Sequence, residues 1–320
     1  MYLISEDNVL EYYSMNQCIE DVEKAFKLSK TSKVDIPFRT VLQHQSEGSH
    51  TLYMPSYVED LAYASIKISS LFPENIKHNI PMIQSVMILT ETKSGKHVAT
   101  ISASALTVLR TGAIGGLGAK YLSRPDSKTL GVVGCGAQSF GQVQAVIEVR
   151  DIKEIYLYNR TRQKAIDLQE KINQTYDERQ LEIHIVEEAN EAVKEADIIV
   201  SSTSSNTPVF SGHHIKPGTH VNAIGSCAPE KQEYDVELLK KAKKVVVDTY
   251  EGATQEAGGL INPVKNKEWS MDNIYGELAD IILKEKDGRT SSEEITLLDS
   301  VGVGYLDTVC AASIYEIMSK

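Results

Sequence analysis

The stretch LGVVGCGAQSFG, residues 130–141, constrains the fold of this chain more than any other segment. An apolar run leads into a G-C-G turn, and residues 137–149 then have helical potential. A strand, a glycine turn and a helix in this order open a dinucleotide-binding βαβ unit. Gly134 allows the tight turn, and Gly136 lets the backbone approach a pyrophosphate. The pattern predicts a nucleotide site, and a purely structural turn in an α/β domain is the alternative.

Apolar runs and helical segments alternate regularly after this turn. The pattern predicts strands at residues 129–133, 154–158, 182–186, 197–202, 220–224 and 244–248, with helices between most of them. Strands that alternate with helices indicate a parallel, doubly wound sheet. Further helices are expected at residues 275–284 and 306–318, and the last of these should pack back on the first part of the chain.

The first part of the chain has a different pattern. Ser5 and Ser14 are candidate N-caps for a pair of helices within residues 5–30. Short strand-like runs follow at residues 39–42, 51–54, 63–68, 82–90 and 97–101. Residues 105–122 read as a helix whose glycines permit close packing, and Pro125 marks the crossing into the next domain. An α/β fold with a second, α+β domain is therefore expected.

Composition excludes several classes of partner. A net charge of −11 without a basic stripe argues against a nucleic-acid partner. The four cysteines are far apart in the sequence and form no C-x-x-C, which argues against a disulfide framework and a structural zinc site. His213 and His214 lack a further ligand at helical spacing, so no metal is expected. With no signal peptide and no apolar run of spanning length, we expect no membrane partner and a cytoplasmic location.

Three cations stand in apolar or small-residue surroundings outside the nucleotide-binding segment: Arg39, Lys67 and Arg110. Charged side chains in such runs are seldom buried without a partner. A structural ion pair would explain any one of them alone. Because no carboxylates stand at comparable positions, the three together suggest a pocket that receives a substrate carboxylate.

The end of the second strand bears on cofactor choice. An NAD enzyme usually places an acidic residue there, which binds the ribose 2′-hydroxyl. Here Asn159, Arg160 and Thr161 offer donors and no acid. A guanidinium can hold a 2′-phosphate that a carboxylate would repel. NADPH is therefore preferred over NADH, with a solvated Arg160 and loose specificity as the alternative.

Several motifs recur in a fixed order along the chain: PFR ending at Arg39, LYMP at residues 52–55, Lys67, LTVLRTGA at 106–113, GCGAQ at 134–138, NAIGSCAPEKQEYD at 222–235 and the tail VGVGYLDTVCAASIY. On these motifs the chain resembles the ornithine cyclodeaminase/mu-crystallin family over essentially its whole length. The resemblance implies a discontinuous substrate-binding and dimerisation domain, residues 1–122 and 303–320, around a Rossmann domain, residues 123–302. It also implies a homodimer and chemistry on α-amino or α-imino acids.

The resemblance also assigns roles to residues. Arg39, Lys67 and Arg110 would bind the substrate carboxylate, and Asp307 would approach the nicotinamide, with helix capping as an equal alternative for Asp307. Among the cofactor-binding candidates are Gly134, Gly136, Ala137 and Gln138 at the pyrophosphate, Asn159, Arg160 and Thr161 at the ribose, and also Thr203 and Ser226.

One departure from the family pattern decides the expected reaction. Cyclodeaminases carry an aspartate where this chain has Cys227, and Leu52 stands where the family has a further acid. A cyclodeaminase needs a base to withdraw a proton and expel ammonia. An imine reductase mainly needs an aligned hydride donor and a carboxylate clamp. The resemblance therefore favours a ketimine reductase, with Cys227 a small apolar residue at the site rather than a nucleophile.

The expected reaction is NAD(P)H-dependent reduction of a cyclic imino acid, such as 1-pyrroline-2-carboxylate or 1-piperideine-2-carboxylate, to L-proline or L-pipecolate. Two alternatives keep the fold: an alanine-type amino-acid dehydrogenase and an ornithine cyclodeaminase. A third belongs to another class, a protein that binds a nucleotide or small ligand without catalysis.

Overall fold

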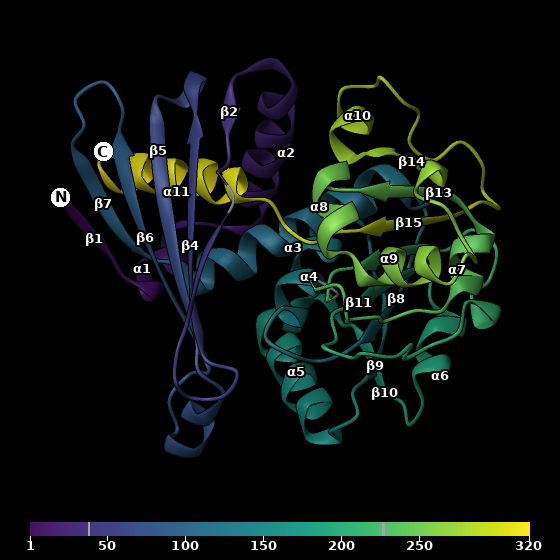
Figure 1. The fold of residues 1–320 in the computed structure, drawn as a ribbon. Helices are drawn as coiled ribbons and strands as arrows, with labels where there is room; N and C mark the ends of the chain where they lie inside the picture. The colour runs from purple at the N-terminus through teal and green to yellow at the C-terminus, as the bar shows by residue number, and fades with distance from the viewer. Residues whose placement is uncertain (38, 226–227) are drawn as a thin grey trace. The chain divides into compact units, whose positions relative to one another are not determined.

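The structure, a computed structural model, describes residues 1–37, 39–225 and 228–320 (Figure 1). The chain divides into two compact units, Met1–Arg110 with Val303–Lys320, and Thr111–Gly302. The division falls inside helix α3 (Ala103–Leu122), whereas the expectation from sequence placed it at the end of that helix. Both termini belong to the first unit.

The first unit is built around a seven-stranded sheet of order β1-β7-β6-β5-β4-β2, with β3 paired to β4. Its strands are β1 (Tyr2–Ile4), β2 (Val34–Asp35), β3 (Thr40–Gln43), β4 (His50–Val58), β5 (Tyr63–Leu71), β6 (Ile83–Glu91) and β7 (His97–Ser102). Its helices are α1 (Glu6–Tyr12), α2 (Met15–Thr31), α11 (Gly304–Met318) and the short η1 (Glu59–Leu61) and η2 (Pro73–His78).

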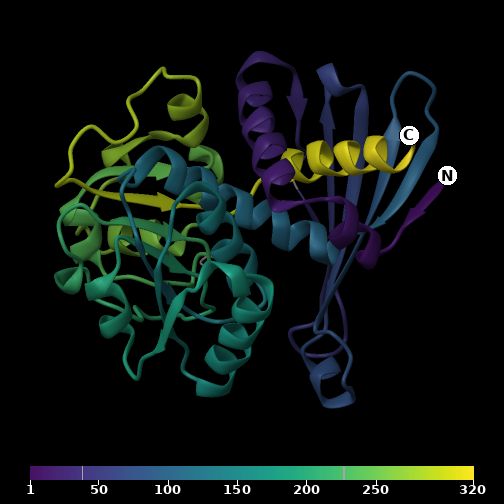
Figure 2. The ribbon, with the colours of Figure 1, turned by 180° about the vertical axis from the view of Figure 1, so that it is seen from behind.

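The helices of this unit form where the sequence indicates them. Ser5 and Ser14 cap α1 and α2 by accepting hydrogen bonds from backbone N–H groups of the first turn, which confirms both expected N-caps. Helix α11 returns to the unit, as expected from its apolar sequence, and packs on α2, β4 and β5. Figures 1 and 2 together show α1, α2 and α11 on the same face of the sheet.

The second unit is a parallel sheet of eight strands with the order β10-β9-β8-β11-β12-β15-β13-β14. Its strands are β8 (Thr129–Val133), β9 (Glu154–Tyr158), β10 (Glu182–Ile185), β11 (Ile198–Ser201), β12 (His220–Ala223), β13 (Ala242–Val247), β14 (Ile274–Glu277) and β15 (Ile295–Asp299). Its helices are α4 (Ser139–Val149), α5 (Arg162–Thr175), α6 (Ala189–Glu195), α7 (Val236–Lys241), α8 (Tyr250–Glu256), α9 (Gly258–Lys265), α10 (Leu278–Ile282), η3 (Asp177–Arg179), η4 (Gly212–His214) and η5 (Met271–Asn273).

Helices cover both faces of this sheet. Side chains of α3, α4 and α5 form one apolar cluster with alternate residues of β8, β9 and β11. Side chains of α6 to α9 form a second apolar cluster on the opposite face. It includes the residues of β8, β9 and β11 that point to that face, together with residues of β12, β13 and β15. Burial on both faces is typical of a doubly wound sheet, so the predicted fold class is confirmed.

The glycines of α3 allow the close packing expected from them. A Cβ atom built on Gly115 would lie 1.9 Å from Oε1 of Gln142, and one built on Gly118 would lie 2.4 Å from Oδ1 of Asn222. Since real Cβ atoms do not approach other atoms so closely, neighbouring side chains fill the space that a larger residue would need. Gln142 and Asn222 donate hydrogen bonds to the carbonyls of Thr111 and Gly115 in return.

Two elements near the end of the second unit differ from expectation. The segment expected as one helix at residues 275–284 is strand β14 followed by the short helix α10. Strand β15, which the sequence pattern did not indicate, lies inside the sheet between β12 and β13. All of its residues are buried, so it lacks the alternation of apolar and polar residues that marks a half-exposed strand.

Candidate active site

The glycine turn follows the central strand β8 at the carboxyl edge of the parallel sheet. Gly134 has a φ of 95°, and a Cβ there would lie 2.7 Å from Cγ2 of Thr203. Both its backbone conformation and its surroundings therefore require glycine. The chain leaves β8 towards β9 on one side and later returns to β11 on the other, so the turn lies at the topological switch point where such sheets bind ligands.

The turn has the features that a dinucleotide needs. A Cβ on Gly136 would meet no atom within 4 Å, so the backbone here borders open space. Helix α4 begins at Ser139, and its first N–H groups have no partner within the helix. The side-chain Oε1 of Gln138 is buried and accepts no hydrogen bond from a described residue. An open glycine turn beside a helix N-terminus fits a pyrophosphate, with Ala137 exposed next to it.

The residues after β9 connect to this turn. The side chain of Asn159 accepts a hydrogen bond from the Cys135 N–H at 2.9 Å and donates one to the Thr161 carbonyl at 3.0 Å. Arg160 and Thr161 are exposed, and the neighbouring Arg162 is paired with Glu187. The segment thus offers one exposed guanidinium, Arg160, and Asn159 serves mainly to hold the turn.

Two of the later candidates lie outside the described residues, namely Ser226 and Cys227. Thr203 is described and lies beside the glycine turn, where its backbone N–H donates a hydrogen bond to Glu233. The adjacent Ser202 donates its hydroxyl to the Gly134 carbonyl at 2.9 Å. The structure therefore brings Thr203 together with the pyrophosphate candidates.

A cluster of buried charges lies within the first unit. Nζ of Lys67 is 2.6 Å from Oδ2 of Asp307, and Nε of Arg110 is 3.0 Å from Oδ1 of the same carboxylate. All three side chains are largely buried. Asp307 is thus a carboxylate partner of Lys67 and Arg110, and the expectation that no carboxylate accompanies these cations is wrong. Arg39 is half-buried, and its charge acts on Lys67. We call Lys67, Arg110, Asp307 and Arg39 the cationic cluster.

Three elements position this cluster. Lys67 lies on β5, Arg110 on α3, and Asp307 in the first turn of α11. Hydroxyl contacts hold α11 on the sheet, since Thr308 hydrogen-bonds Ser56 of β4 and also Ser65 of β5 at 2.8 Å. The N-cap residue of α11 is Val303, and the Asp307 carboxylate accepts hydrogen bonds from Lys67 and Arg110, so the helix-capping alternative for Asp307 is not borne out. Its place in the first turn still interacts favourably with the helix dipole.

The electrostatics of the cluster favour an added anion. Burial and the neighbouring Arg110 and Arg39 guanidinium groups lower the pKa of Lys67, against the opposing effect of Asp307. Burial acts to raise the pKa of Asp307, but Arg110 and Lys67 outweigh it, so this pKa lies below its ordinary value. Two cationic side chains, Lys67 and Arg110, therefore share one carboxylate, and a second carboxylate would offset the remaining positive charge.

Three buried carboxyl groups at the carboxyl edge of the parallel sheet were not predicted: Glu233, Asp248 and Asp299. Burial raises the pKa of Asp299 to about 8, and the charges of Asp248 and Glu233 add to the effect. The Tyr234 hydroxyl donates a hydrogen bond of 2.5 Å to Asp299, which acts to lower the pKa of Asp299 against the effect of burial. Glu233 and Tyr234 belong to a motif quoted above, but position in a motif did not reveal that they are buried.

The cysteines that the structure describes are not bonded to one another. Cys18 of α2 and Cys310 of α11 are far apart in the sequence, yet their sulfur atoms lie 4.0 Å apart in the core of the first unit. No described helix combines the length and the apolar character needed to cross a membrane.

The second unit has the open glycine turn on a doubly wound sheet that is typical of dinucleotide-binding domains, and the first unit holds a cluster of buried charges. The Ornithine cyclodeaminase/mu-crystallin family model matches residues 2–320, and the chain belongs to this family. The resemblance found in the sequence motifs is confirmed.

Relatives with known names cover the whole chain. A Delta(1)-pyrroline-2-carboxylate reductase of Bacillus cereus is 37% identical over 316 residues, which are 99% of this chain and 96% of that protein. The Thermococcus litoralis Delta(1)-pyrroline-2-carboxylate reductase in complex with NADH and L-proline has a TM-score of 0.94 at 36% identity, covering 100% of this chain and 98% of that one. An archaeal alanine dehydrogenase dimer with bound NAD has a TM-score of 0.90 at 33% identity, covering 100% of this chain and 96% of that one.

Proposed function

We propose that this protein is an NAD(P)H-dependent reductase of the C=N bond of cyclic imino acids. The substrate we favour is 1-pyrroline-2-carboxylate, which would give L-proline, with 1-piperideine-2-carboxylate and L-pipecolate as the larger-ring pair. The observation that carries the proposal is the buried cationic cluster, because a small carboxylate substrate offsets its positive charge. Support also comes from relatives named Delta(1)-pyrroline-2-carboxylate reductase, one of which is a structure in complex with NADH and L-proline.

The cationic cluster binds and orients the substrate in this proposal. Arg110 and Arg39 pair with the substrate carboxylate, while Asp307 keeps the Lys67 and Arg110 side chains in place through the hydrogen bonds that it accepts. The lowered pKa of Lys67 makes its ammonium a better proton donor to the imine nitrogen. One hydride on the carbon and one proton on the nitrogen convert C=N to CH–NH, so the reaction balances.

The second unit holds the cofactor, which supplies the hydride when bound. The open turn and the start of α4 would bind the pyrophosphate of the cofactor, at Gly134, Gly136, Ala137 and Gln138. We propose NADPH as the preferred form, because Arg160 is exposed after β9 and residues 159–161 include no carboxylate. We propose further that the protein is a homodimer and works in the cytoplasm. The buried thiols of Cys18, Cys135 and Cys310, which form no disulfide, are in keeping with that location.

The decisive experiment follows NADPH oxidation by absorbance with 1-pyrroline-2-carboxylate, and repeats it with NADH. We expect turnover with both cofactors and a higher kcat/KM with NADPH. Arg110→Ala should raise KM and lower kcat, reducing kcat/KM by about tenfold to a hundredfold, because the lost charge-assisted hydrogen bonds both bind and align the carboxylate. The control is Lys96→Ala, an exposed cation of the β6–β7 hairpin, which should match the wild type.

Other outcomes identify the alternatives. Unchanged kinetics of Arg110→Ala would remove this residue from the site. Reduction of pyruvate that depends on ammonia would indicate an alanine-type dehydrogenase, and ammonia release from L-ornithine would indicate a cyclodeaminase. Saturable NADPH binding without turnover of any imino acid would indicate a binding protein. A higher kcat/KM with NADH would overturn the cofactor preference alone.

A further inference from the structure

Glu233 is a fully buried carboxylate in the loop between β12 and α7, and the proposed reaction does not use it. Its Oε1 accepts hydrogen bonds from the Ser201 hydroxyl at 2.6 Å and from the Thr203 N–H at 2.5 Å. Its Oε2 accepts one from the Gly225 N–H at 2.7 Å. One oxygen thus holds the segment after β11 and the other holds the segment after β12.

The position of Glu233 matters because the sheet ends there. Strands β11 and β12 pair in parallel as far as Ser201 and Ala223, and the last bond of the ladder joins the Ile224 N–H to the Ser201 carbonyl. Beyond it the N–H groups of the half-buried residues Thr203 and Gly225 leave the ladder and donate to Glu233 instead. The same carboxylate serves both, so it takes over from the ladder where the two segments leave the sheet.

The clamped segments touch each other and the glycine turn. A Cβ on Gly225 would lie 2.2 Å from the Thr203 carbonyl oxygen, so the two segments are in contact. The Thr203 side chain in turn packs against Gly134, and Ser202 donates a hydrogen bond to the Gly134 carbonyl. A displacement of the Thr203 segment would therefore also displace the glycine turn, to which the proposed function assigns the pyrophosphate.

The geometry points to Glu233 as a positioning residue for the binding of the nicotinamide dinucleotide. Its carboxylate holds the loops after β11 and β12 at a fixed distance from each other and thereby fixes Thr203 against the glycine turn. This inference rests on the proposed function only in its choice of ligand. Burial raises the pKa of Glu233, while hydrogen bonds from Ser201, Thr203 and Gly225 act in the opposite direction and stabilise the charged form.

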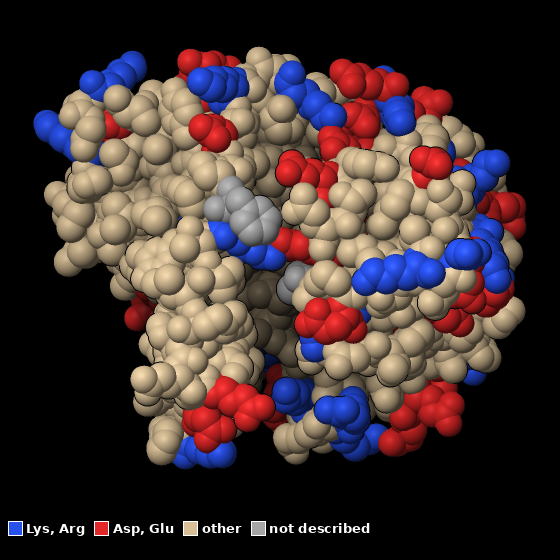
Figure 3. Space-filling view, in the orientation of Figure 1, with Lys and Arg blue, Asp and Glu red and all other residues tan. Residues whose placement is uncertain are grey.

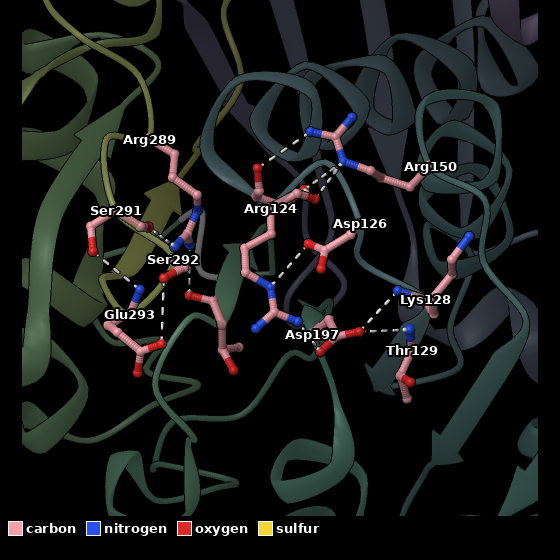
Figure 4. A network of polar contacts seen from close by, with 12 residues as sticks. Arg124, Asp126, Lys128, Thr129, Arg150, Asp197, Arg289, Ser291, Ser292 and Glu293 are labelled. Carbon is pink, nitrogen blue, oxygen red and sulfur yellow. Dashed lines mark hydrogen bonds and ion pairs between the residues drawn. The ribbon is translucent and has the colours of Figure 1, made fainter.

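The opposite edge of the same sheet offers a matched control. Asp197 precedes β11, and its Oδ2 accepts hydrogen bonds from the N–H groups of Lys128 at 2.9 Å and Thr129 at 3.1 Å (Figure 4). Its Oδ1 pairs with Arg124 at 2.8 Å. It therefore joins β8 and β11 at their amino ends much as Glu233 joins β11 and β12 at their carboxyl ends. Because ligands of such sheets bind at the carboxyl edge, Asp197 should affect stability and not binding.

The experiment compares Glu233→Gln with Asp197→Asn in the full chain, measuring the Kd for NADH by its fluorescence and the Tm without ligand. The glutamine side chain of the first variant places an NH2 group against one backbone N–H, so only one loop can stay bound. We expect Glu233→Gln to weaken NADH binding by roughly tenfold. Asp197→Asn should lower Tm and leave the Kd within about twofold of the wild-type value. Glu233→Asp keeps the charge and should recover part of the affinity.

Hydrogen exchange gives a readout that needs no variant. The amides of Thr203 and Gly225 should be protected in the ligand-free wild type, and rapid exchange at both would overturn the clamp even if Glu233→Gln fails to fold. Equal NADH affinities for wild type and Glu233→Gln would also overturn it. A wild type that binds neither NADH nor NADPH would overturn the proposed function together with the clamp. Binding without imine reduction would overturn the proposed reaction alone, and the Kd comparison would still decide on the clamp.

Discussion

The pKa of Lys67 is lowered because its side chain is buried near other cations. Burial, Arg110 and Arg39 each make its charged form less favourable, and the carboxylate of Asp307 partly compensates. If the protonated lysine delivers the proton in the proposed reaction, kcat/KM must fall as pH rises through its pKa. The midpoint of the alkaline limb of the pH profile then reports the pKa of Lys67, and this pKa depends on the charges around the side chain.

The pH profile of Asp307→Asn tests this role. Removing the carboxylate should lower the pKa of Lys67 further and shift the alkaline limb to lower pH. The substrate ionises identically with both proteins, so the difference between the two profiles isolates the protein group. Lys67→Arg serves as the control, because its guanidinium does not deprotonate and the limb should disappear. An alkaline limb that stays in place in Asp307→Asn would argue against Lys67 as the donor.

Asp299 makes a second pH prediction, on stability. An ordinary aspartate has a pKa near 3.9 in the unfolded chain, and burial raises the pKa of Asp299 to about 8 in the folded protein. Between these pH values the folded state keeps a proton that the unfolded state has released. The free energy of unfolding should therefore fall as pH rises from about 4 to about 8, by up to about 1.4 kcal/mol per pH unit from this group.

Urea unfolding of wild type and Asp299→Asn at several pH values measures that contribution. The asparagine does not ionise, so the variant should gain stability relative to the wild type as pH rises through this window. A difference in stability that is constant from pH 5 to pH 8 would show that Asp299 is ionised throughout. The nearby Tyr234 is retained in both proteins and keeps its hydroxyl beside residue 299.

At the scale of elements, α11 carries Asp307 to the cationic cluster, and its docking on the sheet decides where that carboxylate lies. Thr308, the next residue, is fully buried and contacts the hydroxyls of Ser56 and Ser65 on β4 and β5. These contacts join a segment from the end of the chain to two strands near its beginning. The position of Asp307 therefore depends on hydroxyl contacts one residue away.

Replacing Thr308 by valine keeps the shape and removes the hydroxyl. Ser65 and Ser56 then lose a buried partner, and we expect the free energy of unfolding to fall by about 1–3 kcal/mol. Thr308→Ser keeps the hydroxyl and loses one methyl group, so it should cost about 1 kcal/mol. Chemical denaturation measures both. A valine variant as stable as the serine variant would show that these hydroxyl contacts contribute little.

At the scale of the molecule, the first unit exposes apolar side chains that the chain does not cover. Strands β4, β5 and β6 continue beyond the part of the sheet that α11 crosses (Figure 1). Much of this extension is free of charged side chains on the face shown, up to its tip (Figure 3). Its exposed apolar residues include Val41, Leu42, Ile76, Ile80, Met82, Ile83 and Val86. Apolar surface of this kind marks an interaction site, which supports the proposed homodimer.

Sedimentation of the 35.4 kDa chain tests the dimer. We expect a mass of about twice this value for the wild type and a shift towards the monomer for the double variant Leu42→Asp, Ile83→Asp, because charges in a buried interface carry a large desolvation cost. Leu10→Asp is the control, since Leu10 is an exposed apolar residue on α1, a helix that packs on α11 and β7. A wild type that sediments as a monomer would contradict the proposal.

Local patterns were sufficient for much of this protein. The order of strand, glycine turn and helix after Thr129 is set by residues close in sequence, and so are the caps of α1 and α2, which is why these predictions are confirmed. Lys67 and Arg110 were recognised as unusual because cations interrupt apolar runs. The chain order of these features also identified the family.

Other features depend on contacts between distant segments. Asp307 is 240 residues from Lys67 and 197 from Arg110 along the chain, and only the return of α11 to the first unit brings them together. Strand β15 is a strand because its neighbours β12 and β13 cover its edges, and Glu233 is a clamp because two loops end beside it. The hydrophobic periodicity of the sequence does not reveal such partners. It indicates which face of a helix or strand is buried, but not which residues cover that face.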